Sequence, residues 1–308
     1  MNYKICIIGT KDTTISLADY IQKNICKIDC IITIDKGSVD TSKISGYKSI
    51  SSFAEENGIF LFETTDYSLR DEKSKEFFQT NTFDIGICMG WQRLIPQEVL
   101  GRFKYGIYGF HGSCGYLPYG RGRSPLNWSI INGDTRFILN MFRYDEKADS
   151  PNVYQNRMFE INSHDTIRTL QYKNLLVSYE MSKKLIEDYK NDSIKIKTDS
   201  CDFNTLYPKR NPEDGKISFT QKTRDIYNLI RGVTKPFPGA FCLSESTGET
   251  ITVWEAVPFD SILDFSDYIP GQVIDVLDDM PIVRTIDGSL LIKNFECKSK
   301  INKRDILK

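Results

Sequence analysis

The sequence predicts an α/β protein in which an open, mostly parallel sheet is followed by a small, mainly β domain. In the first two hundred residues, short and continuously apolar runs alternate with segments of helical spacing. Continuously apolar strands between helices are typical of a parallel sheet that is covered on both faces. Further along the chain, short apolar runs are separated by Gly, Pro and Asp. A chain of 308 residues is long enough for two domains of these kinds.

Each strand predicted for the first domain is an apolar, often β-branched run that ends at a glycine or a polar turn. These runs are 4–8, 30–34, 59–62, 84–89, 106–110, 136–144 and 153–161. The segments with helical spacing are 14–25, 71–80, 96–102, a helix that begins near Pro125, and 166 to about 189. We therefore predict a Rossmann-like sheet with helices on both faces over residues 1–200. Ligands of such folds bind beyond the carboxyl ends of the strands.

The second predicted domain, residues 201–308, follows a polar linker near residues 199–203. It begins with one amphipathic helix over 220–232. Apolar runs then follow at 240–243, 251–257, 272–276, 282–285 and 289–295. This spacing predicts a small antiparallel barrel of the OB-like type, or a sandwich.

Charge and composition exclude several classes of protein. The chain has 40 basic and 41 acidic side chains, and residues 201–308 hold 14 basic and 16 acidic ones. Neither balance shows the basic excess that nucleic-acid binding usually requires. The eight cysteines are scattered without a CxxC pair, which argues against a zinc site and a disulfide framework. The apolar runs are too short for a signal peptide or a membrane span, so we expect a cytoplasmic protein with no membrane partner and no metal.

Histidine is rare, and its two positions differ in their setting. His164 lies in a polar run before a predicted helix, where a surface or capping role is the simplest interpretation. His111 follows an apolar strand and opens the glycine-rich loop GFHGSCGYLPYGRGRSPLNW, so a structural role is weighed against a catalytic one. A histidine that acts as a general base usually has a carboxylate beside it. Asp149, which follows the predicted strand 136–144, is a candidate for that carboxylate.

Several motifs follow one another along the chain. HGS is followed by LPYGRGRSPLNW, NGDT and KADSP, and the second half adds YPKRNPEDGKISF, IYNLIRGVTKPFPGAF, IPGQVI and DGSLLI. This succession resembles the formyltransferases that use 10-formyltetrahydrofolate, a family that includes methionyl-tRNA formyltransferase. GRGRSPLNW and KRNPEDG are most similar to the sugar N-formyltransferases, which formylate 4-amino sugars on nucleotide carriers. The resemblance covers nearly the whole chain, most tightly residues 106–149 and 207–241.

The resemblance implies that His111 and Asp149 are the catalytic residues. In the family, the His of an Asn-x-His motif and a downstream Asp deprotonate the attacking amine, a kind of help worth roughly 10²- to 10⁴-fold in rate. The Asn of that motif donates a hydrogen bond to the developing oxyanion, and Gly109 takes its place here. The loss of one such donor costs about 3 kcal/mol in other enzymes. The candidate replacements are protonated His111, the amides of the glycine-rich loop, Asn127 and Asn140.

Two binding regions are also implied by the resemblance. The donor 10-formyltetrahydrofolate is expected along the strand ends, at Met89, Gly90, Arg123, Asp145, Glu146, Lys147, Ala148 and Asp149. The nucleotide-linked amino sugar is expected near the RGRSP loop and the domain junction, at Arg121, Arg210 and Asp214. Structural alternatives stay open: Met89 as core, Arg121 and Arg123 facing solvent, a salt link between Arg210 and Asp214, and Trp128 packing its helix instead of stacking on a base.

The sequence thus predicts an enzyme that transfers a formyl group from 10-formyltetrahydrofolate to a UDP- or dTDP-linked 4-amino sugar. The resemblance implies a place in polysaccharide or glycan biosynthesis. Methionyl-tRNA formyltransferase is disfavoured because residues 201–308 lack a basic excess. A third hypothesis, which only Gly109 supports, is a relative that binds folate or nucleotide sugar without turnover. The C-terminal domain offers a surface for a homodimer.

Overall fold

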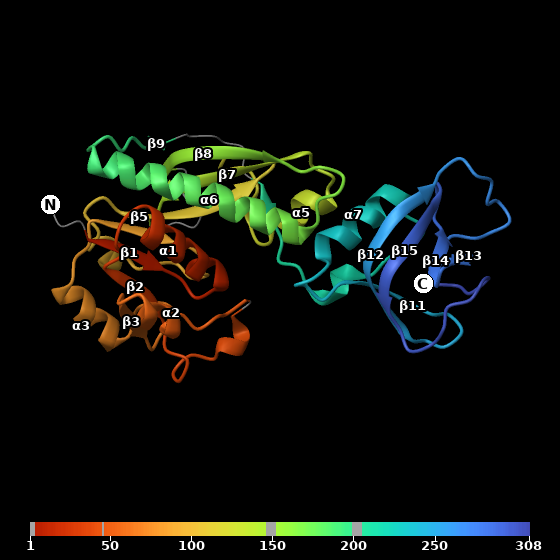
Figure 1. The fold of residues 1–308 in the computed structure, drawn as a ribbon, viewed down its shortest axis with the longest axis horizontal. Helices are drawn as coiled ribbons and strands as arrows, with labels where there is room; N and C mark the ends of the chain where they lie inside the picture. The colour runs from red at the N-terminus through yellow and green to blue at the C-terminus, as the bar shows by residue number, and fades with distance from the viewer. Residues whose placement is uncertain (1–3, 45, 146–151, 199–204) are drawn as a thin grey trace. The chain divides into compact units, whose positions relative to one another are not determined.

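The computed structural model describes residues 4–44, 46–145, 152–198 and 205–308 (Figure 1). The chain divides into two compact units. The first comprises Met1–Arg121, Ile138–Met158 and Lys173–Thr205, and the second comprises Gly122–Phe137, Phe159–Tyr172 and Leu206–Lys308. The second unit therefore includes two segments from within residues 1–200. The predicted linker at residues 199–203 lies outside the described residues, and a boundary near residue 200 stays a prediction.

An eight-stranded sheet forms the centre of the first unit. Its strands, in spatial order, are β3 Phe60–Thr64, β2 Cys30–Ile34, β1 Ile5–Ile8, β4 Ile85–Cys88, β5 Ile107–Ser113, β7 Arg136–Arg143, β8 Asn152–Glu160 and β9 Lys197–Thr198. The first five strands pair in parallel, whereas β5 pairs antiparallel with β7, and β8 with β9. Every residue of β1, β2 and β4 is buried. The predicted open, mostly parallel sheet is confirmed.

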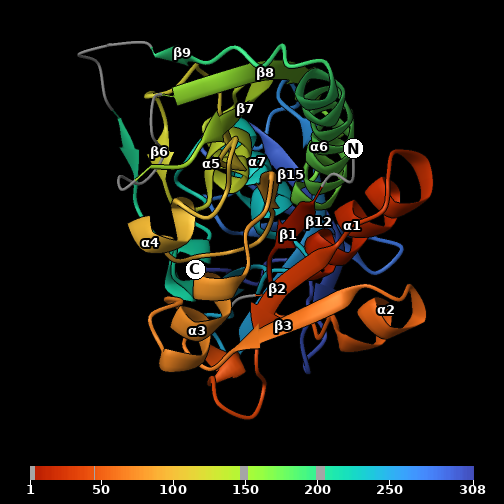
Figure 2. The same cartoon turned by 90° about the vertical axis from the view of Figure 1, so that its left-hand side faces the viewer.

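Helices cover both faces of this sheet. They are α1 Asp12–Asn24, α2 Ser51–Glu56, α3 Glu72–Thr80, α4 Gln97–Leu100 and α6 Ile167–Lys190, with a short 3-10 turn η1 Thr41–Lys43. Figure 2 shows α1 and α6 on one side of the sheet, and α3 and α4 on the other. Tyr20 of α1 stacks on Tyr179 of α6 with ring centroids 4.4 Å apart. On the opposite face, Phe78 of α3 and Val99 of α4 join Cys88 of β4 in one core cluster.

The second unit is built on a five-stranded antiparallel sheet. Its order is β11 Ala240–Leu243, β12 Thr250–Asp260, β15 Ser289–Glu296, β14 Met280–Arg284 and β13 Val273–Leu277. Helix α7 Thr223–Val233 packs on this sheet, and the unit also holds α5 Pro125–Ile131 and the 3-10 turn η2 Pro212–Gly215. A further two-stranded sheet consists of β6 Arg121–Gly122 and β10 Leu206–Tyr207. The prediction of a mainly β second domain is confirmed.

The last residues of the chain cover both edges of the five-stranded sheet. Leu307 forms a β-bridge with Ser244, next to edge strand β11, and Ile306 forms one with Gln272, next to edge strand β13. Val273 donates a backbone hydrogen bond to Asp305 at 2.8 Å. Because both edges find hydrogen-bond partners in the same segment, the sheet is closed toward a barrel, and neither edge is left as a template for aggregation.

Strand β5 is longer than the sequence predicted. The predicted strand ended at residue 110 and His111 opened a loop, whereas the structure continues β5 to Ser113. The reason is its antiparallel neighbour β7, which pairs residue by residue with Tyr108 to Ser113 and satisfies their backbone groups. The expectation that His111 lies in a loop was therefore wrong: it lies within a strand.

Asp71 caps α3 and has a depressed pKa. Its carboxylate accepts hydrogen bonds from the Ser74 amide at 3.1 Å, the Ser74 hydroxyl at 2.6 Å and the Thr64 hydroxyl at 2.6 Å. Burial by itself raises the pKa of Asp71, but the hydrogen bonds outweigh it and lower the pKa from 3.8 to about 2. Because the folded-state pKa is depressed, the stabilisation is fully present above the unfolded pKa and is lost as the pH falls toward 2.

We expect Asp71→Ala to lower the free energy of unfolding by about 1–2 kcal/mol at pH 7. The deficit relative to wild type shrinks between roughly pH 4 and pH 2, because the wild-type carboxylate then becomes protonated. Urea titrations at several pH values measure this difference. Glu72→Ala, at an exposed position of the same helix, is the control and changes stability by less than about 0.5 kcal/mol. An Asp71→Ala deficit that does not vary with pH contradicts the prediction.

Candidate active site

The candidate site lies where β5 extends beyond β4. Cys88, the last residue of β4, is paired with Gly109, whereas β5 continues for four more residues to Ser113. Among the described strands, Phe110–Ser113 are paired with β7 alone. This position is the carboxyl edge of the parallel part of the sheet, where ligands of open α/β folds bind.

Five side-chain positions share one face of the sheet at this edge. Gly109 and His111 are two residues apart in β5 and therefore point to the same side of the sheet. Cys88 is paired with Gly109 across β4, while Phe142 and Asn140 of β7 lie opposite Gly109 and His111. Directly paired residues of antiparallel strands have Cβ atoms about 4.5–5.5 Å apart. The strand register thus brings Asn140 beside His111.

His111 is 9% exposed, and one of its ring nitrogens has a fixed partner. Nε2 lies 2.8 Å from the carbonyl oxygen of Gly120 in the glycine-rich loop. A carbonyl only accepts, so Nε2 carries the proton and Nδ1 of the neutral ring keeps the lone pair. Gly120 has φ +72°, in the left-handed region that favours glycine. The loop is therefore shaped to present this carbonyl to His111.

The carboxylates expected beside His111 are described only in part. Asp149 lies outside the described residues, as do Glu146, Lys147 and Ala148. Asp145 is described, and its carboxylate accepts a hydrogen bond from the Asn152 amide at 3.0 Å. The assignment of Asp149 as the partner of His111 stays a prediction.

The two asparagines that were candidate oxyanion donors have different settings. Asn127 of α5 belongs to the second unit, where its side-chain amide donates to the Gly232 carbonyl at 2.8 Å. This bond ties α5 to α7, so Asn127 has a structural role there. Asn140 lies beside His111, is 1% exposed, and donates to the Ile138 carbonyl at 3.3 Å. Among the described residues, its Oδ1 has no hydrogen-bond partner.

The segment that follows β4 is held through its backbone carbonyls. Met89 is 8% exposed and its carbonyl accepts from the Thr14 hydroxyl at 2.6 Å, while the Gly90 carbonyl accepts from the Thr10 hydroxyl at 3.1 Å. Because so little of it is exposed, the Met89 side chain packs in the core.

Trp91, which the sequence did not single out, is also 8% exposed, and its indole Nε1 has no partner within the described part of the chain. A buried indole N–H without an acceptor costs free energy unless a ligand supplies one.

In the second unit, Arg210 lies over an aromatic surface. Its guanidinium is 4.9 Å from the Trp128 ring centroid, and Trp128 stacks with Tyr207 at 6.3 Å and an interplanar angle of 17°. Burial lowers the pKa of Arg210. Its Nη2 donates to the backbone carbonyl of Asp214 at 2.8 Å, whereas the Asp214 carboxylate accepts from the Asn211 amide at 2.6 Å. Both residues therefore shape one local turn by these contacts.

The two other arginines of the predicted site are held through their backbones. The amide of Arg121, which is partly exposed, donates to the Thr205 carbonyl at 3.0 Å. The amide of Arg123, which is exposed, donates to the Tyr207 carbonyl at 3.0 Å. Between them, Gly122 has φ +108°, and a Cβ there would lie 2.3 Å from the Tyr207 carbonyl oxygen. Glycine is thus required where these two segments meet.

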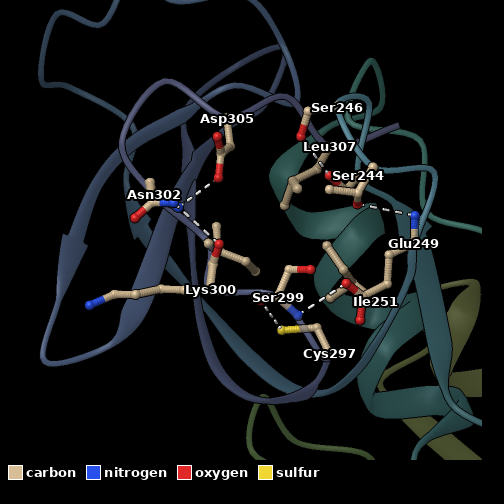
Figure 3. Close-up of a pocket in the computed structure, with 12 residues that line it drawn as sticks. Ser244, Ser246, Glu249, Ile251, Cys297, Ser299, Lys300, Asn302, Asp305 and Leu307 are labelled. Atoms are coloured by element: carbon tan, nitrogen blue, oxygen red, sulfur yellow. Dashed lines mark hydrogen bonds between the residues drawn. The ribbon is translucent and has the colours of Figure 1, made fainter.

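A separate hollow of about 160 Å³ lies in the second unit (Figure 3). Its polar groups are used to hold the surrounding loops. The Glu249 carboxylate accepts from the backbone amides of Lys298 and Ser299, and these bonds lower its pKa. The Asn302 amide donates to the Asp305 carboxylate at 2.6 Å. No residue of the predicted site lines this hollow. Elsewhere in the described ranges, no group of three His, Cys, Asp or Glu side chains is placed to hold a metal ion.

Comparison with known families identifies the fold and the chemistry of the chain. The model of the family described as Formyl transferase matches residues 3–182, and that of the Formyl transferase C-terminal domain matches residues 209–308. The chain belongs to the formyl transferase family. This formyl transferase is 28% identical over 298 residues to the methionyl-tRNA formyltransferase of Fusobacterium nucleatum, a match that covers 96% of this chain and 93% of that protein.

A second relative matches one part of this formyl transferase more closely. The bifunctional polymyxin resistance protein ArnA of Wigglesworthia glossinidia brevipalpis is 34% identical over 197 residues, which are 62% of this chain and 28% of that protein.

Solved structures share the fold. The N-formyltransferase from Helicobacter canadensis, in complex with folinic acid and dTDP-3-aminofucose, superimposes with a TM-score of 0.68 at 18% identity, over 95% of this chain and 99% of that one. WlaRD, a sugar 3N-formyl transferase in the presence of dTDP and 5-N-formyl-THF, gives 0.68 at 20% identity, over 96% and 99%. Across the described residues, no helix of this formyl transferase is both long and apolar enough to cross a membrane.

Proposed function

We propose that this formyl transferase transfers a formyl group from 10-formyltetrahydrofolate to the amino group of a UDP- or dTDP-linked amino sugar. The observation that carries the proposal is the fixed tautomer of His111 at the carboxyl edge of the sheet. Nε2 donates to Gly120, and we assign to Nδ1 the uptake of the proton from an attacking amine. The reaction forms a bond between the amine nitrogen and the formyl carbon and breaks the bond from that carbon to the folate nitrogen.

His111 acts first as the base and then as the acid in this reaction. The amine loses a proton as it attacks, and the departing folate nitrogen gains one, so the ring first accepts and then returns a proton. The contact between Nε2–H and the Gly120 carbonyl is retained in both states and strengthens when the ring is charged. We assign to Asp149 the stabilisation of the imidazolium cation that forms when the ring accepts the proton.

The residues after β4 fit a folate donor, which supplies the formyl carbon. The buried indole N–H of Trp91 is an unsatisfied donor, and a heterocycle rich in acceptor atoms can satisfy it. Gly90, with φ +80°, allows the backbone of the same segment to approach a ligand closely. We assign Met89, Gly90 and the residues from Asp145 to Asp149 to the donor. Proteins that share the fold bind folinic acid or 5-N-formyl-THF.

The second unit fits a nucleotide better than an RNA. The Trp128 ring carries the Arg210 guanidinium on a partly exposed aromatic surface, and Arg123 is exposed nearby in the same unit. A nucleoside diphosphate offers a planar base for such a ring and phosphates for the guanidinium groups. We assign Arg121 and Arg210 to the nucleotide, with Asp214 shaping the turn that holds Arg210, and Arg123 to the folate donor. Structures of this fold contain dTDP-3-aminofucose or dTDP.

Methionyl-tRNA formyltransferase is the second candidate function. It is favoured by relatives of that name that match almost the whole chain, in Fusobacterium nucleatum and in Flavobacterium psychrophilum. RNA binding depends on the neutralisation of phosphates by basic side chains. Residues 201–308 hold 14 basic and 16 acidic side chains, so this part of the chain lacks the charge that tRNA binding requires.

The test is tetrahydrofolate release from 10-formyltetrahydrofolate with a panel of UDP- and dTDP-linked 3-amino and 4-amino sugars. We expect saturable turnover with at least one sugar, and none with a methionyl-tRNA acceptor at physiological salt. Matched reactions contain the corresponding hydroxyl sugars, which lack the amine. Turnover with methionyl-tRNA alone would establish the second candidate. Tight binding of folate or sugar without any turnover would replace both by a non-catalytic binding role.

A further inference from the structure

The space beside Gly109 is filled by another side chain. A Cβ built on Gly109 would lie 2.2 Å from Cε1, 2.3 Å from the hydroxyl oxygen and 2.4 Å from Cζ of Tyr144. Real Cβ atoms do not approach other atoms so closely, so any side chain at position 109 would displace the Tyr144 phenol. The Tyr144 hydroxyl therefore occupies the position in which a side chain at residue 109 would begin.

Local structure explains how Tyr144 reaches this position. Tyr144 follows β7, and its backbone amide donates to the Ile107 carbonyl of β5 at 2.8 Å. Its side chain lies on the same face as Phe142, two residues earlier, and the two rings are 5.2 Å apart. From there the phenol extends diagonally across β5 and over Gly109. The Tyr144 side chain is partly buried, at the carboxyl edge of the parallel part of the sheet.

The Tyr144 hydroxyl and His111 are suitably spaced for one reacting group. Gly109 and His111 are two residues apart on one face of β5, and the Cα atoms of residues so placed are about 6.5–7 Å apart. The hydroxyl over Gly109 and the His111 ring are therefore neighbours on this face, so one formyl group can direct its oxygen to the hydroxyl while the attacking amine meets the ring. Other donors on this face are less suitable: Asn140 is 1% exposed and donates to Ile138, and Cys88 is 2% exposed with only a weak S–H donor.

One partner of the Tyr144 hydroxyl is the Cys88 thiol. Burial raises the pKa of the Cys88 thiol to about 12, and the Tyr144 hydroxyl is a hydrogen-bond partner of that thiol. A neutral thiol is a weak acceptor. An oxygen that gains negative charge attracts the phenol hydrogen more strongly than a thiol does.

We propose that Tyr144 is a catalytic residue whose hydroxyl donates a hydrogen bond to the formyl oxygen as negative charge develops on it. This inference rests on the proposed formyl transfer. It assigns to Tyr144 the donor role that an Asn side chain at position 109 has in the family, and it explains why residue 109 is glycine. The pair Gly109 and Tyr144 replaces the Asn as a unit.

A packing test requires no ligand. Gly109→Asn forces the Tyr144 ring out of place, and we expect its thermal midpoint to fall by about 5 °C or more. In a Tyr144→Ala background the space is open, so the same Gly109→Asn change lowers the midpoint by less than about 2 °C. Equal losses in the two backgrounds overturn the assignment of Tyr144 to the space at Gly109.

The kinetic test removes only the hydroxyl. Tyr144→Phe is expected to lower kcat by about 100-fold while the KM values change by less than about threefold, because the donor acts on charge that exists only in the transition state. Gly109→Asn with Tyr144→Ala regains at least about tenfold over Tyr144→Ala alone, because the Asn amide supplies a donor. Tyr108→Phe is the matched control: its hydroxyl lies on the opposite face of β5 and donates to the Tyr105 carbonyl at 3.0 Å.

A second reaction separates this proposal from the proposed acceptor. Water can attack the same formyl group, and the products are tetrahydrofolate and formate, so the same oxygen gains charge without any sugar. If no sugar is formylated but Tyr144→Phe slows this hydrolysis at least tenfold, the acceptor assignment fails and the role of Tyr144 stands. If a sugar is formylated and Tyr144→Phe matches wild type in kcat, the role of Tyr144 is overturned and the proposed function stands. Absence of both reactions overturns both.

Discussion

His111→Asn is expected to lower kcat for tetrahydrofolate release by about 10²- to 10⁴-fold. Asparagine keeps a polar side chain but is too short to reach the Gly120 carbonyl, which accepts from Nε2 at 2.8 Å in the wild type. The Ser113 hydroxyl, which donates to the Gly115 and Tyr119 carbonyls at 3.0 Å, still anchors the glycine-rich loop, but the side chain at position 111 cannot accept a proton from the amine. Donor affinity, measured by fluorescence titration with 5-formyltetrahydrofolate, changes by less than about threefold, because the lost interaction belongs to the transition state.

The control for this prediction is the other histidine. His164→Asn changes an exposed side chain of the second unit and is expected to leave kcat within about twofold of wild type. A His111→Asn enzyme that retains more than a tenth of the wild-type kcat would show that the amine is deprotonated elsewhere. A loss of donor binding that parallels the loss of kcat would instead assign His111 a structural role.

Arg231→Met is expected to lower the free energy of unfolding of the second unit by about 3 kcal/mol or more. Arg231 is 5% exposed and satisfies three acceptors: the carbonyls of Asn162 and Asp165 at 3.0 and 2.7 Å, and the Asn228 amide oxygen at 2.9 Å. Methionine fills a similar volume but donates nothing, so buried acceptors remain without partners. The cost is therefore one of lost hydrogen bonds, with little contribution from a cavity.

Urea unfolding followed by tryptophan fluorescence measures this loss, since Trp128 and Trp254 belong to the same unit. Arg224→Met is the matched control. Arg224 lies on the same helix and also over the Tyr227 ring, at 5.4 Å, but its side chain is exposed. We expect it to cost less than about 1 kcal/mol. Similar losses for the two variants would mean that the cation–π contact with Tyr227, and not the buried hydrogen bonds, carries the stability.

The strands were predictable because their signal is local. Runs such as Cys30–Ile34 and Ala240–Leu243 are continuous or alternating apolar segments that end at breakers, and the structure places strands there. The amphipathic pattern of 220–232 likewise predicted α7, which begins three residues later, at Thr223. The two-residue strands β6, β9 and β10 were missed, as was α2. Two-residue strands are defined by a distant partner and have no periodicity of their own.

The candidate site was predictable only as separate residues. A rare histidine after an apolar strand, in a glycine-rich segment, pointed to His111, but the end of β5 was misplaced because β7 extends it by pairing. Trp91 directly follows Gly90 and Tyr144 directly precedes Asp145, yet the sequence singled out neither residue. Neither an orphan indole N–H nor a phenol over a glycine leaves a pattern along the chain.

The sequence by itself determined the fold class, the order of strands and helices, the formyl transferase motifs and the identity of the rare groups. Each of these depends on residue type and on spacing along the chain. Only the tertiary structure decided which nitrogen of His111 keeps the lone pair, that Asn140 lies beside it, and that Tyr144 fills the space at Gly109. These facts depend on strand register and side-chain direction, which bring together atoms from segments far apart in sequence, and local periodicity carries no information on such distances.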